Sequence, residues 1–172
     1  MKFGEFLKSE FFEPLGMKDT GFYVPANQKA RVAVPYERME KGKFKRYTGY
    51  NLGISNDVSL PNAYESGGAG LVSTIDDYAR FAQMLLNGGN YGGTQILQKR
   101  TVKYLTQGSL SERQKEGMKN WIELSGHTYG NLMRILEEPE KATSFGKKGE
   151  LKDSGIQPVI RKIRNVVFSS EI

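Results

Sequence analysis

The residue types best suited to covalent chemistry are a serine and a lysine three positions apart, Ser144 and Lys147. A lysine one helical turn from a serine can take the hydroxyl proton and so activate the oxygen for attack on a carbonyl carbon. Tyr129 and Asn131 form a second short pattern, Tyr-x-Asn. Together these residues suggest acyl transfer through a serine ester.

The local sequence argues against that site. Gly146 lies inside the pair and Gly149 follows it, which favours a loop over the helical turn that would place Lys147 beside Ser144. Short patterns of Ser, Lys, Tyr and Asn also arise readily by chance. We therefore predict no catalytic residue in this chain and interpret Ser144, Lys147 and Tyr129 as decoys.

His127 is the only histidine, so a Ser-His-Asp triad would have to use it. No nucleophile or orienting carboxylate with a motif around it lies nearby in the sequence, and we predict a structural or partly exposed side chain. One histidine, no cysteine and no His-Glu-x-x-His pattern leave only scattered carboxylates, so we predict no metal site. The absence of cysteine also excludes disulfides and thiol catalysis.

A glycine-rich turn at 68–73 comes near the fingerprint of dinucleotide-binding proteins and opens a helix. A buried strand would have to precede it, but the residues there read PNAYES, and Ser73 replaces the final Gly or Ala. The pattern is better interpreted as a tight turn under a helix cap. We predict no bound cofactor.

The clearest secondary-structure signal is a turn, a helix and a glycine stop at 66–89. Ser73 and Thr74 can each cap the helix by accepting a hydrogen bond from a backbone N–H, and Asp76 and Asp77 place negative charge on the positive end of the helix dipole. Gly88 can end the helix in the left-handed conformation. An apolar stripe at helical spacing is expected to face the core: Ile75, Tyr78, Ala82, Leu85 and Leu86.

Weaker signals surround this helix. Two further helices are expected, one over 1–12 that Pro14 ends and one over 99–107 that turns Val102 and Leu105 inward. Residues 108–120 are polar and expected to be exposed. Short strands are expected at four places: 20–24, 32–36, 121–124 and 129–136.

Three segments in the same order resemble serine β-lactamase-related proteins, the family of class C β-lactamases, penicillin-binding-protein-like peptidases and esterases. Residues 11–25, FFEPLGMKDTGFYVP, are similar to the family's Phe-x-Pro-Leu-Gly-Met-x-x-Thr segment. Residues 67–81, GGAGLVSTIDDYARF, are similar to Gly-Gly-x-Gly-Leu-x-Ser-Thr-x-x-Asp-x-x-x-Phe. Residues 126–135, GHTYGNLMRI, resemble its late Tyr-Gly-x-x-x-Arg strand. The resemblance covers roughly residues 3–150.

This resemblance implies an α+β fold class: a helix-rich, partial β-lactamase/transpeptidase-like fold with a few antiparallel strands. The parent reaction would be acyl transfer from a small-molecule ester, amide or β-lactam to a serine. The family's Ser-x-x-Lys and Tyr-x-Asn motifs would lie upstream of Met1, and its Lys-Thr-Gly or His-x-Gly motif would follow residue 150. We therefore expect a fragment that is inactive alone.

The expected organisation is a partial β-lactamase-related domain at 1–150 and a divergent tail at 151–172. The tail shows neither the turn nor the strands that the family would place there, as an altered reading frame or a truncated gene would produce. A partial sheet leaves exposed edges, which favour self-association or pairing with a complementing upstream chain.

The positive net charge of +6 is concentrated in one segment. Residues 27–48 hold seven Lys or Arg against two Glu, and aromatic residues interleave with them. Such a segment can follow a phosphate backbone, but no recognised nucleic-acid module surrounds it, so we predict no nucleic-acid partner. The competing hypothesis is a non-catalytic binding module in which loop 27–50 holds an acidic or cell-wall partner.

No apolar run approaches the ~20 residues needed to cross a bilayer, so no membrane span is predicted. The first residues also carry Glu5, Lys8 and Glu10 where a signal peptide needs an uninterrupted apolar region. As written, the chain is expected in the cytoplasm, although the parent family can be exported.

Overall fold

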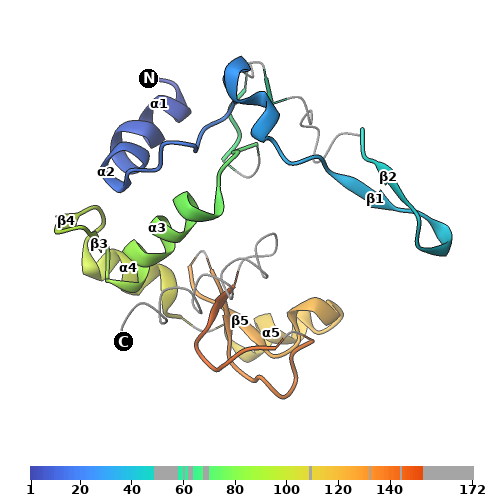
Figure 1. Cartoon of the computed structure of the whole chain (residues 1–172). Coiled ribbons are helices and arrows are strands. Elements are labelled where there is room, and N and C mark those ends of the chain that lie inside the picture. The colour runs from blue at the N-terminus through green and yellow to red at the C-terminus, as the bar shows by residue number, and fades with distance from the viewer. Residues whose placement is uncertain are drawn as a thin grey trace, which may run out of the picture. The chain divides into compact units, whose positions relative to one another are not determined.

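The computed structural model describes residues 1–48, 58–59, 61, 64–67, 70–108, 110–131, 133–143 and 145–152. The chain divides into two compact units, Met1–Tyr78 and Ala79–Ile172. Both units combine short helices with small antiparallel sheets (Figure 1). The predicted helix-rich α+β fold class is therefore confirmed.

The first unit begins with a helix that runs through Pro14 instead of ending there. α1 (Phe3–Leu7) continues into a π-helical segment, Lys8–Phe12, and then into α2 (Glu13–Leu15). The Glu13 N–H donates to the Lys8 carbonyl five residues back. In an α-helix the proline ring would clash with the carbonyl four residues back, and this wider turn accommodates it. The predicted stop at Pro14 was wrong for this reason.

The chain leaves this helix at Gly16, whose φ of 67° is left-handed. Met17 then donates a backbone hydrogen bond to the Phe12 carbonyl at 2.7 Å. Phe3 of α1 packs against Phe22, with ring centroids 5.9 Å apart. Among the residues of this unit that the structure describes, the buried apolar side chains are Phe12, Leu15, Met17 and Phe22.

A two-stranded hairpin follows a 3-10 helix at Ala26–Arg31. β1 (Tyr36–Arg38) and β2 (Phe44–Arg46) pair antiparallel, and Lys41 and Gly42 adopt φ angles of 58° and 74° in the turn between them. The strand predicted at 32–36 begins only at its last residue, and the hairpin itself was not predicted. The strand expected at 20–24 is reduced to an isolated bridge between Gly21 and Val72.

α3 (Ile75–Leu86) is the predicted central helix, and both of its ends are set locally. The Asp77 N–H donates to the Thr74 hydroxyl oxygen at 3.2 Å, so Thr74 is the N-terminal cap. At the other end Gly89 N–H bonds the Met84 carbonyl and Gly88 N–H bonds the Leu85 carbonyl, which is a Schellman motif.

The predicted apolar stripe of α3 is only partly buried. Ile75 and Leu86 are exposed, whereas Met84, which was not assigned to the stripe, is fully buried. Asp77 is buried as well. A burial pattern of this kind depends on which neighbours the helix meets, which periodicity does not reveal.

The second unit places a tight hairpin and two helices after α3. β3 (Asn90–Tyr91) pairs with β4 (Thr94–Gln95), and α4 (Lys99–Thr106) follows with Val102 buried, as predicted. α5 (Glu112–Met118) lies in the stretch expected to be polar and exposed; it is largely exposed, but the helix was missed. Ser111 and Gln114 form a capping box, a sequence signal that marks its start.

A three-stranded antiparallel sheet completes the described part of this unit. β5 (His127–Tyr129), β6 (Arg134–Leu136) and β7 (Leu151–Lys152) lie in that order. The strand predicted at 129–136 is instead a hairpin, and the strand predicted at 121–124 is a 3-10 helix, Ile122–Leu124. β7 lies just beyond the expected domain boundary at 150, which stays a prediction.

Within the described ranges, no helix combines the length and the apolar character that crossing a membrane requires.

Candidate functional site

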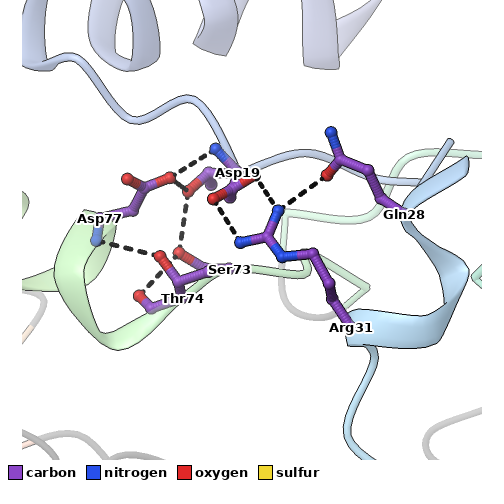
Figure 2. A network of polar contacts seen from close by, with 7 residues as sticks. Asp19, Gln28, Arg31, Ser73, Thr74 and Asp77 are labelled. Atoms are coloured by element: carbon purple, nitrogen blue, oxygen red, sulfur yellow. Dashed lines mark hydrogen bonds and ion pairs between the residues drawn. The ribbon is translucent and has the colours of Figure 1, made fainter.

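A dense polar network of the first unit is centred on the carboxylate of Asp77. Its Oδ2 accepts hydrogen bonds from the Asp19 N–H at 2.7 Å and from the Thr20 hydroxyl at 2.9 Å (Figure 2). Only 2% of Asp77 is exposed. A buried carboxylate is costly unless hydrogen bonds compensate its lost hydration, and these two donors do so.

Two hydroxyl groups extend this network to the turn before α3. Thr20 Oγ1 lies 2.8 Å from Ser73 Oγ. Because the Thr20 hydroxyl donates its only proton to Asp77, Ser73 is the donor in this contact; the Ser73 hydroxyl also lies 3.3 Å from the Thr74 carbonyl oxygen, a second acceptor. Ser73 therefore binds Thr20 and does not cap the helix, which corrects one of the two predicted caps.

Arg31 extends the network through its contact with Asp19. Its guanidinium makes a two-pronged ion pair with both oxygens of Asp19 at 2.7 Å, and Nη1 also donates to Gln28 Oε1 at 3.1 Å. The hydrogen bonds and the negative charge of Asp19 raise the pKa of Arg31 above its ordinary value. Bidentate pairing of this kind fixes orientation as well as charge.

The network joins two segments that are 50 to 60 residues apart in the chain. Gly21 and Val72 exchange backbone hydrogen bonds at 3.0 and 2.8 Å directly beside it. One segment contains FEPLGMKDT and the other contains GLVSTIDD, so the first two motifs of the sequence analysis meet here. The structure thus gives these motifs a common task, the anchoring of one segment on the start of α3.

The chemistry open to this network is limited. Arg31 is permanently protonated and cannot accept a proton, and Asp77 already accepts from two donors. The Ser73 hydroxyl is directed at Thr20 and not at a base. These features favour a structural anchor over a nucleophilic site.

A second polar group lies in the sheet of the other unit, where His127, Thr128 and Arg134 are all buried. The Leu110 N–H donates to Thr128 Oγ1 at 2.8 Å. His127 Nδ1 lies 2.8 Å from the Ser125 carbonyl, which can only accept, so Nδ1 carries the proton. This bond orients the imidazole and supports the structural role predicted for His127.

The sequence-derived decoys are placed as follows. Ser144 lies outside the described residues. Lys147 is exposed in a turn where its carbonyl accepts from the Glu150 N–H at 3.1 Å. Tyr129 pairs with Arg134 across the hairpin, and the Asn131 side chain donates to the Tyr104 carbonyl at 2.8 Å. That none of them is catalytic stays a prediction.

No metal-binding cluster is assembled in the described ranges. No group of three or more His, Cys, Asp or Glu side chains gathers there in a way that could hold a metal ion. The turn at 68–73 includes Gly68 and Ala69, which lie outside the described residues, and its Ser73 belongs to the network around Asp77.

Comparison with known proteins identifies the family. The sequence model of the β-lactamase family matches residues 1–169. Two curated relatives from Mycobacterium tuberculosis, the uncharacterized protein MT1414 of strain CDC 1551 and protein Rv1367c of strain H37Rv, are each 33% identical over 141 residues. The match covers 79% of this chain but 33% of each relative, so the chain spans about a third of their length.

Solved structures show the same fold. EstCE1, described as a hydrolase with promiscuous acyltransferase activity, superposes with a TM-score of 0.63 at 23% identity, over 89% of this chain and 40% of its own. The simvastatin synthase LovD of Aspergillus terreus superposes with a TM-score of 0.62 at 19% identity, over 94% of this chain and 48% of its own. Since the family model matches nearly the whole sequence, this chain belongs to the β-lactamase family.

Proposed function

We propose that residues 1–172 contribute scaffold to a serine acyl-transfer enzyme and that this polypeptide alone is catalytically inactive. In the complete reaction a serine oxygen attacks an ester, amide or β-lactam carbonyl, the alcohol or amine leaves, and water releases the acid from the acyl-serine. The nucleophile would come from a segment outside these residues, on the same polypeptide or on a complementing chain.

The observation that carries this proposal is the network around Asp77. It is built from the two family motifs, and its polar atoms are occupied with one another and with the backbone. Lys147 is exposed in a turn, and the Asn131 amide is bound to a backbone carbonyl. These contacts support a scaffold role for the motif residues.

The experiment is the intact mass of the 172-residue protein after incubation with a penicillin and, separately, with an activated nitrophenyl ester, alongside a colour assay for turnover. We expect neither a stoichiometric acyl adduct nor turnover from folded protein. The matched control is Ser144→Ala. An adduct that peptide mapping assigns to Ser144 and that this variant abolishes would overturn the proposal.

A second candidate function is non-catalytic binding of an acidic partner by loop 27–50. It is supported by the β1–β2 hairpin, in which Arg38, Lys43, Lys45 and Arg46 are all exposed. Binding to poly-glutamate should weaken steeply with ionic strength, and further when Lys43, Lys45 and Arg46 are changed to Glu. Binding that depends neither on ionic strength nor on these three substitutions would exclude this candidate.

A further inference from the structure

The register of the β1–β2 hairpin sorts its side chains onto two different faces. Tyr36 pairs with Arg46, and Arg38 pairs with Phe44. Paired residues of an antiparallel ladder point to the same side, about 5 Å apart, and positions two apart along a strand share that side. Two aromatic rings and two guanidinium groups therefore alternate on one face, which we call the Arg-aromatic face.

All four side chains of the Arg-aromatic face are exposed. Tyr36 is 62% exposed and Phe44 is 70% exposed, and both arginines are exposed as well. The opposite face carries the pair of Glu37 and Lys45, whose charged atoms lie 4.0 Å apart. The one acidic residue within the two strands is thus balanced by a neighbour, and the Arg-aromatic face keeps its positive charge.

The turn end of the hairpin adds apolar surface and further cations. Met39 donates a backbone hydrogen bond to the Lys43 carbonyl and is 46% exposed. Lys43, opposite Met39, and Lys41 in the turn are exposed, as is the acidic Glu40 that follows Met39. Residues 36–46 contain five Lys or Arg and two Glu, a net charge of +3 within eleven residues.

We propose that this hairpin binds the surface of an anionic phospholipid membrane, with its turn entering the headgroup layer. The inference rests on the second candidate function and names its partner. Exposed apolar side chains flanked by cations, with a tyrosine further from the tip, suit a bilayer interface, where apolar groups leave water and cations meet lipid phosphates.

The apolar tip is what favours lipid over other acidic partners. A nucleic acid offers bases that stack on Tyr36 and Phe44, and an acidic protein offers carboxylates to Arg38 and Arg46. Neither partner would stabilise exposed Met39 as much as lipid would, because its thioether chain can neither stack as a ring nor bind an anion. Lipid provides an apolar environment for Met39 and Phe44 and anionic groups for the arginines.

The test is co-sedimentation of the 172-residue protein with vesicles of phosphatidylcholine, with and without phosphatidylglycerol. We expect binding only when phosphatidylglycerol is present. Arg38→Gln with Arg46→Gln should weaken it about 30-fold, because each cation near an anionic surface contributes on the order of a fivefold gain. Met39→Ser with Phe44→Ser should weaken it at least tenfold by removing the apolar anchor.

The matched control is Lys103→Gln with Arg113→Gln, which removes the same charge from exposed positions on α4 and α5. It should bind anionic vesicles within about twofold of the unchanged protein, as expected for cations outside the contact region. Circular dichroism of every variant verifies that the fold is retained.

Several outcomes would overturn the inference. One is equal binding to both kinds of vesicle, and another is equal weakening by the control and the hairpin arginine variants. Salt-sensitive binding to poly-glutamate or to single-stranded DNA without any to anionic vesicles would also overturn it, while leaving the wider acidic-partner candidate standing. Absence of binding to every anionic probe would overturn both the membrane inference and the wider acidic-partner candidate.

Discussion

The carboxylate of Asp77 accepts a hydrogen bond from the Thr20 hydroxyl at 2.9 Å, although 57 residues separate them in the chain. The same oxygen accepts the Asp19 N–H, so a single buried atom holds two consecutive residues of the incoming segment. Asp77 therefore links the two motifs that first connected this sequence with its family.

Asp77→Ala should destabilise the protein substantially. The change leaves the Asp19 N–H and the Thr20 hydroxyl without their acceptor, and hydrogen bonds to a buried charged group are each worth about 1.5–3 kcal/mol. We expect the free energy of unfolding to fall by about 3 kcal/mol, as measured by denaturant titration. Asp76→Ala is the matched control, because Asp76 is exposed in the same turn and should cost under about 1 kcal/mol. Similar losses for both variants would contradict the anchoring role.

Gly89→Ala should be far more damaging than Gly92→Ala in the same connection. Both glycines have positive φ, 95° and 57°. A Cβ at Gly89 would lie 1.9 Å from the Leu97 carbonyl oxygen, whereas nothing lies within 4 Å of one at Gly92. We expect a loss of about 1 kcal/mol for Gly92→Ala and at least about 3 kcal/mol for Gly89→Ala, measured by denaturant titration. Equal losses would show that the connection can move away from Leu97.

The ion pair of Lys115 predicts a pH-dependent contribution to stability. Lys115 Nζ lies 2.8 Å from Glu137 Oε2 and 3.5 Å from Glu112 Oε1, so it links α5 to the residue after β6. The hydrogen bond to Glu137 raises the pKa of Lys115 above its ordinary value of 10.5. A raised pKa means that the stabilisation is complete below 10.5 and is lost as pH rises through the folded-state value.

Lys115→Gln should therefore lower Tm at neutral pH, and the difference from the unchanged protein should shrink under strongly alkaline conditions. Lys119→Gln is the control, because Lys119, which caps the end of α5, pairs with Glu116 three residues earlier and both side chains are well exposed. Its Tm should stay close to that of the unchanged protein at both pH values. A Lys115 effect that persists in alkali would point to packing of the side chain and not to its charge.

Exposed apolar residues predict that the 172-residue protein associates. Trp121 and Ile122 are adjacent, and about 70% of each is exposed. Large exposed apolar groups favour contact with another protein surface. Light scattering should show a mass that rises with concentration, and Trp121→Ser with Ile122→Ser should reduce the rise. Tyr64→Ser, which changes a single exposed aromatic residue, should reduce it less. A constant monomer mass would contradict this prediction.

The start and the end of α3 could be predicted from the sequence because the interactions that set them are local. The family of the chain could also be predicted from the sequence. Thr74 caps the helix through an atom three residues away, and Gly88 ends it through its own backbone freedom. The capping box of Ser111 and Gln114 was equally local, and it would have revealed α5 had it been used. Three motifs in the family's order led to the family that the sequence model confirms.

The tertiary structure decided which of these residues work together. From the sequence, Asp77 was expected to be a charge near the start of the helix and Ser73 to be a cap. They belong to one network because the fold places Thr20 within hydrogen-bond distance of both. The Arg-aromatic face likewise depends on the register that places Arg46 opposite Tyr36. Propensities act over one or two turns, whereas hydrogen bonds across 57 residues depend on how the whole chain packs.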